Sequence, residues 1–203
     1  MSVSYPWFIP PPELAGRTAE QWSKAEAKTF LEWQLRVIEP RVAQMLRYLN
    51  DDASGSRKEL LLRLGEKVAA ILPAKGYSIE PDRQSTETGT GPASREAILC
   101  ARDYRRLTET GMALASDLGL LLAKLVLEDC GGAVRWDVLR KPKSALAYNL
   151  PVLVGLKKYP GQHVEPIRVS IANGSALVRG EGSPDAWWRA YEAFIKDAGC
   201  KES

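Results

Sequence analysis

The sequence contains one histidine, His163, and three widely spaced cysteines, Cys100, Cys130 and Cys200. A single histidine excludes metal sites built on two histidines, and it makes any Ser-His or Cys-His catalytic pair depend on one loop residue beside Gly161. No cysteine lies at metal-ligand spacing from another cysteine or from the histidine, so no structural zinc site is expected. An odd number of scattered cysteines is more typical of reduced thiols than of a disulfide framework.

Motifs for nucleotide binding and for serine-hydrolase chemistry are also missing, since the chain has no GxSxG, GxxxxGK[ST] or GxGxxG. No cofactor and no metal ion is therefore predicted, and the sequence favours a protein that is not an enzyme. One catalytic alternative stays open, which is an enzyme whose site is assembled from scattered polar residues. Its candidate residues are Asp117, Asp137, Tyr148, Asn149 and His163.

Composition and charge are those of a soluble globular protein. The 203 residues suit a single domain spanning 1–203, with 45% hydrophobic and 26% charged residues. A net charge of +3 falls short of the basic stripe expected of a dedicated nucleic-acid binder. The N-terminal MSVSYPWFIPPPE has no cation before its apolar part, and the apolar run near 118–127 is interrupted by Lys124. Neither a signal peptide nor a membrane span is predicted, so a cytoplasmic location is expected.

An extended arm begins the chain. Residues 3–16 are rich in proline and aromatic residues, and each proline disfavours helix in the residue before it. The arm can pack on the body or present itself to a partner. Packing is favoured, because exposed Trp7, Phe8 and Ile9 would promote aggregation.

Two amphipathic helices are predicted after the arm. Ser23 and Glu26 match a capping box, and apolar residues then recur at steps of three and four along one face. Pro40 falls inside this pattern and is expected either to kink the helix or to restart it. A second helix is predicted to begin at Ser56 and to end before Pro73.

The middle of the chain contains its most apolar segment. Residues 75–92 have turn residues and almost no apolar periodicity, which predicts a flexible excursion. A third helical region begins near Ala93, in which Gly111 and Gly119 allow close approach of another helix, or Gly111 marks a break. Apolar residues surround 118–127 almost completely, which predicts the central buried helix.

A small sheet and a last helix are predicted in the C-terminal half. Residues 133–139 and 151–156 have the β-branched and aromatic content of strands. Residues 167–171 alternate apolar with polar side chains and are a third strand candidate, with 176–178 as a fourth. A terminal helix is predicted over 185–198. The expected fold class is therefore α+β and helix-dominated, with the small sheet packed against the long N-terminal and central helices.

Residues 134–161, VRWDVLRKPKSALAYNLPVLVGLKKYPG, predict a structured basic loop between two strands. Alternation along the first strand places Val134 and Trp136 on one face, so Trp136 is expected to be buried and the 140–143 turn exposed. If the loops bring the two basic clusters together, they form a positive patch with aromatic side chains that suits an acidic protein partner. The candidate partner-binding residues are Arg140, Lys141, Lys143, Tyr148, Lys157, Lys158 and Tyr159.

Three sequence blocks carry a resemblance, namely WFIPPPELAGRTAEQWSKAEAKTFLEWQL, LASDLGLLLAKLVLED and RWDVLRKPKSALAYNLPVLVGLKKYPG. With them the chain resembles a group of uncharacterised bacterial proteins that share a Trp-rich start, a hydrophobic helix with a Leu-Gly, and a Trp-Asp…Pro-Lys…Tyr-Asn…Pro-Val-Leu block. The resemblance covers most of the chain apart from 75–92. It implies kinship and brings no activity, cofactor or catalytic residue.

Several small cytoplasmic bacterial proteins of this helix-plus-small-sheet character look like immunity proteins. We therefore expect a non-catalytic protein-binding protein of the bacterial cytoplasm, which neutralises a toxin or effector with an acidic surface. The scattered-residue enzyme is the alternative, and a nucleic-acid-binding protein that uses the same basic clusters is the second alternative.

Overall fold

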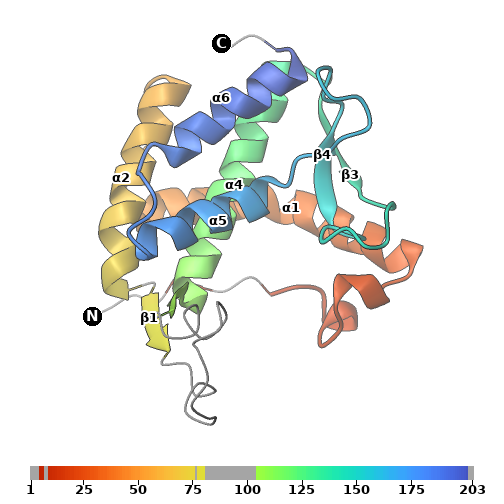
Figure 1. Ribbon diagram of the computed structural model, residues 1–203, viewed down its shortest axis with the longest axis horizontal. Helices are drawn as coiled ribbons and strands as arrows, with labels where there is room; N and C mark the ends of the chain where they lie inside the picture. The colour runs from red at the N-terminus through yellow and green to blue at the C-terminus, as the bar shows by residue number, and fades with distance from the viewer. Residues whose placement is uncertain (1–4, 7–8, 76, 81–103, 201–203) are drawn as a thin grey trace, which may run out of the picture.

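Helices dominate the computed structural model, which describes residues 5–6, 9–75, 77–80 and 104–200 (Figure 1). The helix-dominated α+β fold expected from the sequence is confirmed, with the small sheet β3–β4 in the C-terminal half. The described elements are the 3-10 helices η1 (Pro12–Leu14) and η2 (Ala19–Gln21), the helices α1 (Lys24–Tyr48), α2 (Arg57–Lys75), α4 (Glu109–Cys130), α5 (Pro166–Val178) and α6 (Ala186–Ala198), and the strands β1 (Tyr77–Glu80), β2 (Tyr104–Leu107), β3 (Arg135–Val138) and β4 (Pro151–Val154).

Helix α4 is the centre of the core. It contacts α1, α2, α5 and α6, and all its residues from Ala113 to Ala123 are buried. The central buried helix predicted over 118–127 is therefore confirmed, whereas a break at Gly111 is wrong, because α4 runs unbroken from Glu109. Among the described helices, only α4 is long and apolar enough to cross a membrane, and most of its apolar stretch is buried inside the protein.

Helices α4 and α5 pack unusually close together at Gly119. A Cβ atom added there would lie 2.5 Å from the Cα of Ile167 and 2.8 Å from the carbonyl oxygen of Pro166. Only a residue without a side chain permits this approach. The prediction that Gly119 allows a close helix contact is confirmed.

The predicted strands over 167–171 and 176–178 are wrong, because both segments belong to α5. The buried residues of this helix recur every four residues, at Pro166, Ser170, Gly174 and Val178. Three of these four are not large hydrophobic residues, so the helical stripe was hidden in the sequence. Ser170 also accepts a hydrogen bond from the Trp187 indole N–H at 2.7 Å and donates one to the Ala115 carbonyl oxygen at 2.6 Å, which joins α4, α5 and α6.

Helices α1 and α2 begin close to the expected positions. Ser23 caps α1 and forms the predicted capping box with Glu26. Pro40 lies inside α1, which continues without restarting, and α2 runs past Pro73 instead of ending before it.

The turn between α1 and α2 is held by Asp51. Its carboxylate accepts hydrogen bonds from Arg63 at 2.8 and 2.9 Å, from Lys67 at 2.7 Å and from the Ala53 backbone N–H at 3.0 Å. These partners, the Arg63 hydrogen bond above all, hold the pKa of Asp51 well below its usual range.

Strands β3 and β4 pair antiparallel, with Trp136 opposite Leu153. The predicted alternation along β3 is confirmed, since Val134 is buried while Arg135 and Asp137 are exposed. Trp136 packs against the core on the predicted face but is only half-buried, so the prediction that it is buried is wrong in degree.

The N-terminal arm and the segment 75–92 are described in part. Tyr5 and Leu14 are buried and Ile9 is exposed, while Trp7 and Phe8 lie outside the described residues. Lys75 is the last residue of α2, and residues 77–80 form β1, which pairs with β2. The rest of the segment 75–92 lies outside the described residues.

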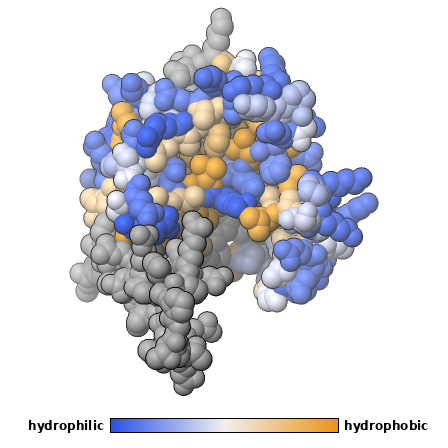
Figure 2. Space-filling view, in the orientation of Figure 1, coloured by the Kyte–Doolittle hydropathy of each residue, from blue (hydrophilic) through white to orange (hydrophobic). Residues whose placement is uncertain are grey.

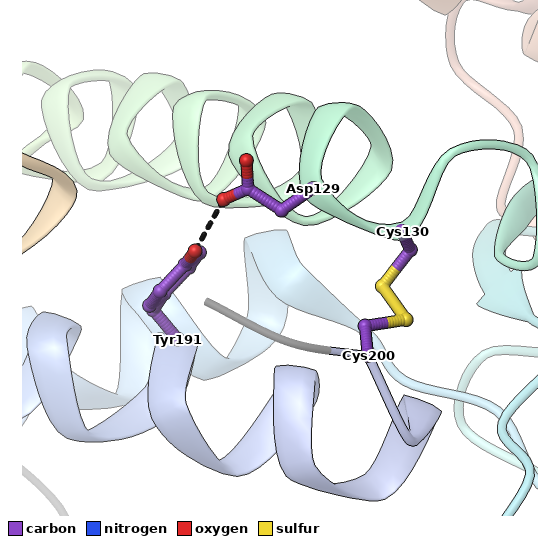
Figure 3. The surroundings of a disulfide bond; sticks show 4 residues. All are labelled: Asp129, Cys130, Tyr191 and Cys200. Atoms are coloured by element: carbon purple, nitrogen blue, oxygen red, sulfur yellow. Dashed lines mark hydrogen bonds between the residues drawn. A yellow bond between two sulfur atoms is a disulfide. The ribbon is translucent and has the colours of Figure 1, made fainter. Parts of the chain in front are cut away.

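A disulfide joins Cys130 and Cys200, with Cα atoms 5.3 Å apart (Figure 3). The expectation of reduced thiols is wrong for this pair; Cys100 lies outside the described residues. Gly199 ends α6 in a left-handed conformation, and the chain then reaches the C-terminal end of α4. Seventy residues separate the two cysteines in the sequence, so their spacing gave no sign that they meet.

Candidate functional site

The connection between β3 and β4, residues 139–150, is anchored to the N-terminal part of the molecule by Asn149. The side-chain nitrogen of this buried residue donates hydrogen bonds to the carbonyl oxygens of Ala19 at 2.9 Å and Trp22 at 2.8 Å. Its side-chain oxygen accepts a hydrogen bond from Arg140 at 2.9 Å, and Arg140 also donates to the Lys24 carbonyl oxygen at 2.9 Å. Arg140 and Asn149 therefore fix the connection in place.

The outer part of the same connection is exposed. Lys141 and Lys143 point into solvent, and Leu146 is 72% exposed, while Tyr148 is half-buried. The 140–143 turn was expected to be exposed, which holds for Lys141 and Lys143 but not for the half-buried Arg140. An exposed leucine on an anchored loop, with two cations close by in sequence, is an arrangement typical of a binding surface.

The second predicted basic cluster lies elsewhere. Arg140–Lys143 follows the end of β3 and Lys157–Lys158 follows the end of β4, and these two strands are antiparallel. The clusters therefore lie at opposite ends of the two-stranded sheet (Figure 1) and do not form the single patch considered from the sequence. Lys158 is paired with Asp197 at 3.1 Å and lies over the ring of Tyr159, 4.8 Å from its centroid. Its hydrogen bonds, first to Tyr159 and then to Asp197, raise the pKa of Lys158.

The five candidate catalytic residues do not share a site. Asp117 is buried in the α4 core, Asn149 anchors the connection, and the exposed Asp137 accepts a hydrogen bond from the Val138 backbone N–H at 2.7 Å. His163 lies 3.5 Å from a Glu165 carboxylate oxygen. None of the five, Tyr148 included, is hydrogen-bonded to another.

Asp117 is instead the centre of a buried polar cluster. Its carboxylate accepts a hydrogen bond from the Tyr5 hydroxyl and pairs with Arg41 at 2.7 and 2.9 Å. Arg41 also donates to the Pro6 carbonyl oxygen at 3.1 Å. Burial raises the pKa of Asp117, against the hydrogen bonds from Arg41 and Tyr5, and burial also raises the pKa of Tyr5. The cluster attaches the N-terminal arm to the core helix.

An apolar cleft of about 470 Å³ lies beside the connection. This volume is typical of ligand-binding clefts. Figure 2 shows hydrophobic side chains on this face of the molecule. The walls come from α1, α4, α5 and the 146–151 segment, and the lining residues are Phe30, Gln34, Met112, Ser116, Leu146, Leu150, Pro151, Glu165, Ile167, Arg168 and Ile171.

Gln34 is the unusual member of this lining. It is only 2% exposed, and its amide nitrogen Nε2 is buried with no hydrogen-bond partner among the described residues. Sequence reasoning missed it. The signal was a glutamine at helical spacing from Leu31 and Ile38, inside an apolar face of α1.

No metal site can be built from the described residues, because no three His, Cys, Asp or Glu side chains gather within the described ranges. Comparisons with models of protein families, with curated proteins and with solved structures found no match for this chain. The candidate site therefore depends on its own geometry, namely the anchored 139–150 connection and the cleft beside it.

Proposed function

We propose that this protein is a non-catalytic protein-binding protein, of the bacterial immunity type that neutralises a toxin or effector, and that it binds through the 139–150 connection. The observation that carries the proposal is the contrast within this connection. Its base is fixed by Asn149 and Arg140, while Lys141, Lys143 and Leu146 are presented to solvent.

An anchored loop favours binding because its backbone is already ordered. Less conformational freedom is then lost when a partner binds, so more of the contact energy appears as affinity. Leu146 provides apolar area that a partner can bury, and Lys141 and Lys143 attract acidic surfaces and speed the encounter. The partner that this surface fits has an apolar site bordered by acidic residues.

The two alternatives have less support. The candidate catalytic residues lie at separate places with separate partners, so no shared cleft argues for catalysis. A nucleic acid would need a longer run of unpaired cations, whereas Arg140 is used in the anchor and Lys158 pairs with Asp197. The binding proposal does not depend on the compartment: the cytoplasm is the location expected from the sequence, and the Cys130–Cys200 disulfide is typical of an oxidising compartment.

The experiment compares three tagged proteins in the native bacterial host: the wild type, a loop variant and a matched control. The loop variant carries Lys141→Glu, Lys143→Glu and Leu146→Ser, and the control carries Lys157→Glu, an exposed charge reversal at the opposite end of the sheet. Exposed substitutions usually change stability by about 0.5 kcal/mol or less, so all three proteins should fold.

A partner qualifies if the wild type and the control retain it and the loop variant loses it. The partner should also be toxic when expressed alone, and co-expression of the wild type should restore growth. Equal retention by the loop variant and the wild type would reject the 139–150 connection as the binding surface. A retained partner without toxicity would reject the immunity role.

A further inference from the structure

The cleft beside the connection contains one polar group whose hydrogen bonding is incomplete. Buried donors in folded proteins are nearly always paired, because an unpaired buried N–H loses its hydrogen bond to water and gains none in return. The Nε2 group of Gln34 is such an exception. The hydroxyl of Ser116, also in the lining, is already used, since it donates to the Met112 carbonyl oxygen at 2.7 Å.

The charges at the cleft are balanced. Arg168 and Glu165, both part of the lining, lie 3.3 Å apart and form an ion pair. Because these two charges pair with each other, a charged group on the ligand is not expected. The remaining lining side chains, apart from Gln34 and Ser116, are apolar.

A neutral group that can pair with a primary amide must accept a hydrogen bond, and it pairs best if it also donates one. The amide of Gln34 has an N–H donor and an oxygen acceptor. A peptide group has the same two functions in complementary arrangement, with its C=O accepting from Nε2 and its N–H donating to the glutamine oxygen. Extended peptides in partner proteins present such groups next to side chains that enter apolar pockets.

We propose that the cleft binds an extended peptide segment of the protein partner, with one apolar side chain in the cleft and one peptide group hydrogen-bonded to Gln34. This inference rests on the proposed function, because Leu146 belongs both to the 139–150 connection and to the cleft lining. The cationic outer face of the connection then contacts the acidic residues of the partner next to that segment.

The test uses small capped amino acids in place of the unidentified partner. N-acetyl-leucine methylamide carries one apolar side chain between two peptide groups. The comparison compounds are N-acetyl-lysine methylamide, which has a charged side chain, n-hexanol, which lacks a peptide group, and decanoate, an apolar chain with a carboxylate. In the wild type, the side-chain N–H signals of Gln34 are followed in ¹H–¹⁵N NMR spectra during each titration. In every protein, including the variants without this amide, affinity is measured from the backbone N–H signals of the lining residues Met112, Ser116 and Leu150.

The leucine compound is expected to shift the Gln34 side-chain signals saturably, and the lysine compound should not. Gln34→Leu should bind the leucine compound roughly threefold to tenfold more weakly, the effect of one net hydrogen bond. Gln162→Leu makes the same chemical change at an exposed residue outside the cleft and should bind like the wild type. Ile171→Trp fills the cleft and should abolish binding, which keeps the test decisive if Gln34→Leu does not fold.

The inference is overturned if the leucine compound leaves the Gln34 signals unchanged, or if Gln34→Leu binds it as tightly as the wild type. Tighter binding of decanoate or hexanol would show that the cleft is a site for small apolar molecules instead. These outcomes are separate from those of the proposed function. If the capped amino acids fail while the loop variant still loses its partner, only the occupant of the cleft is wrong.

Discussion

Removal of the Cys130–Cys200 disulfide should destabilise the protein strongly. The bond closes a loop of 70 residues, and the loop-closure entropy that such a cross-link removes from the unfolded chain corresponds to about 4 kcal/mol at 25 °C. For a domain of this size, that loss lowers the midpoint of thermal unfolding by roughly 8–16 °C. A typical domain has a free energy of unfolding of about 5–15 kcal/mol, so this loss is about one quarter of it or more.

The assay is cleanest in a Cys100→Ser background, where Cys130 and Cys200 are the remaining cysteines. Native protein from an oxidising compartment should react with no thiol reagent, and reduction should expose two thiols and lower the unfolding midpoint. In the matched control Cys130→Ser/Cys200→Ser, a reductant should change nothing. Two reactive thiols in the native protein, or a midpoint that does not depend on reductant, would refute the disulfide and this calculation.

Three further substitutions test the packing and the electrostatics. Gly119→Ala should destabilise by about 1–3 kcal/mol in chemical denaturation although alanine favours helix, because its Cβ would overlap the backbone of α5; a more stable variant would contradict the close contact. Asp51→Asn should cost about 1–3 kcal/mol at pH 7. The pKa of Asp51 is depressed in the folded protein, so its contribution is present above the unfolded value of about 4 and the gap to wild type should close as pH falls below it; a constant gap from pH 7 to acid would be inconsistent. Trp136→Ala should cost about 2 kcal/mol by thermal unfolding, less than the 3–5 of a fully buried tryptophan, since it is half-buried; an unchanged midpoint would mean that Trp136 contributes nothing to the core.

Local patterns in the sequence were sufficient to predict much of the fold. The capping box at Ser23, the apolar surround of α4 and the aromatic face of α6 each lie within one element, so each could be identified without knowing its neighbours. Helix α5 was missed because its buried stripe is made of proline, serine, glycine and valine. Those residues pack well only because Gly119 on α4 admits the α5 backbone.

The candidate site depended more on contacts distant in sequence. Composition identified the 134–161 block, but it could not separate anchoring residues such as Arg140 and Asn149 from exposed ones such as Lys141. The separation of the two basic clusters follows from antiparallel pairing, and the unpaired amide of Gln34 follows from how α1, α4 and α5 surround it. Neither feature can be recognised from a short stretch of sequence.

The bonds of the N-terminal segment also constrain how the chain can fold during synthesis. Tyr5 bonds to Asp117, 112 residues later, and Asn149 bonds to Ala19 across 130 residues. Arg140 likewise reaches Lys24 across 116 residues. The Arg41 bond to Pro6 can form early, because α1 follows the segment directly. The bonds to Asp117, Arg140 and Asn149 cannot form until these residues have left the ribosome, so the contacts that join the first part of the protein to its C-terminal half are among the last to be completed.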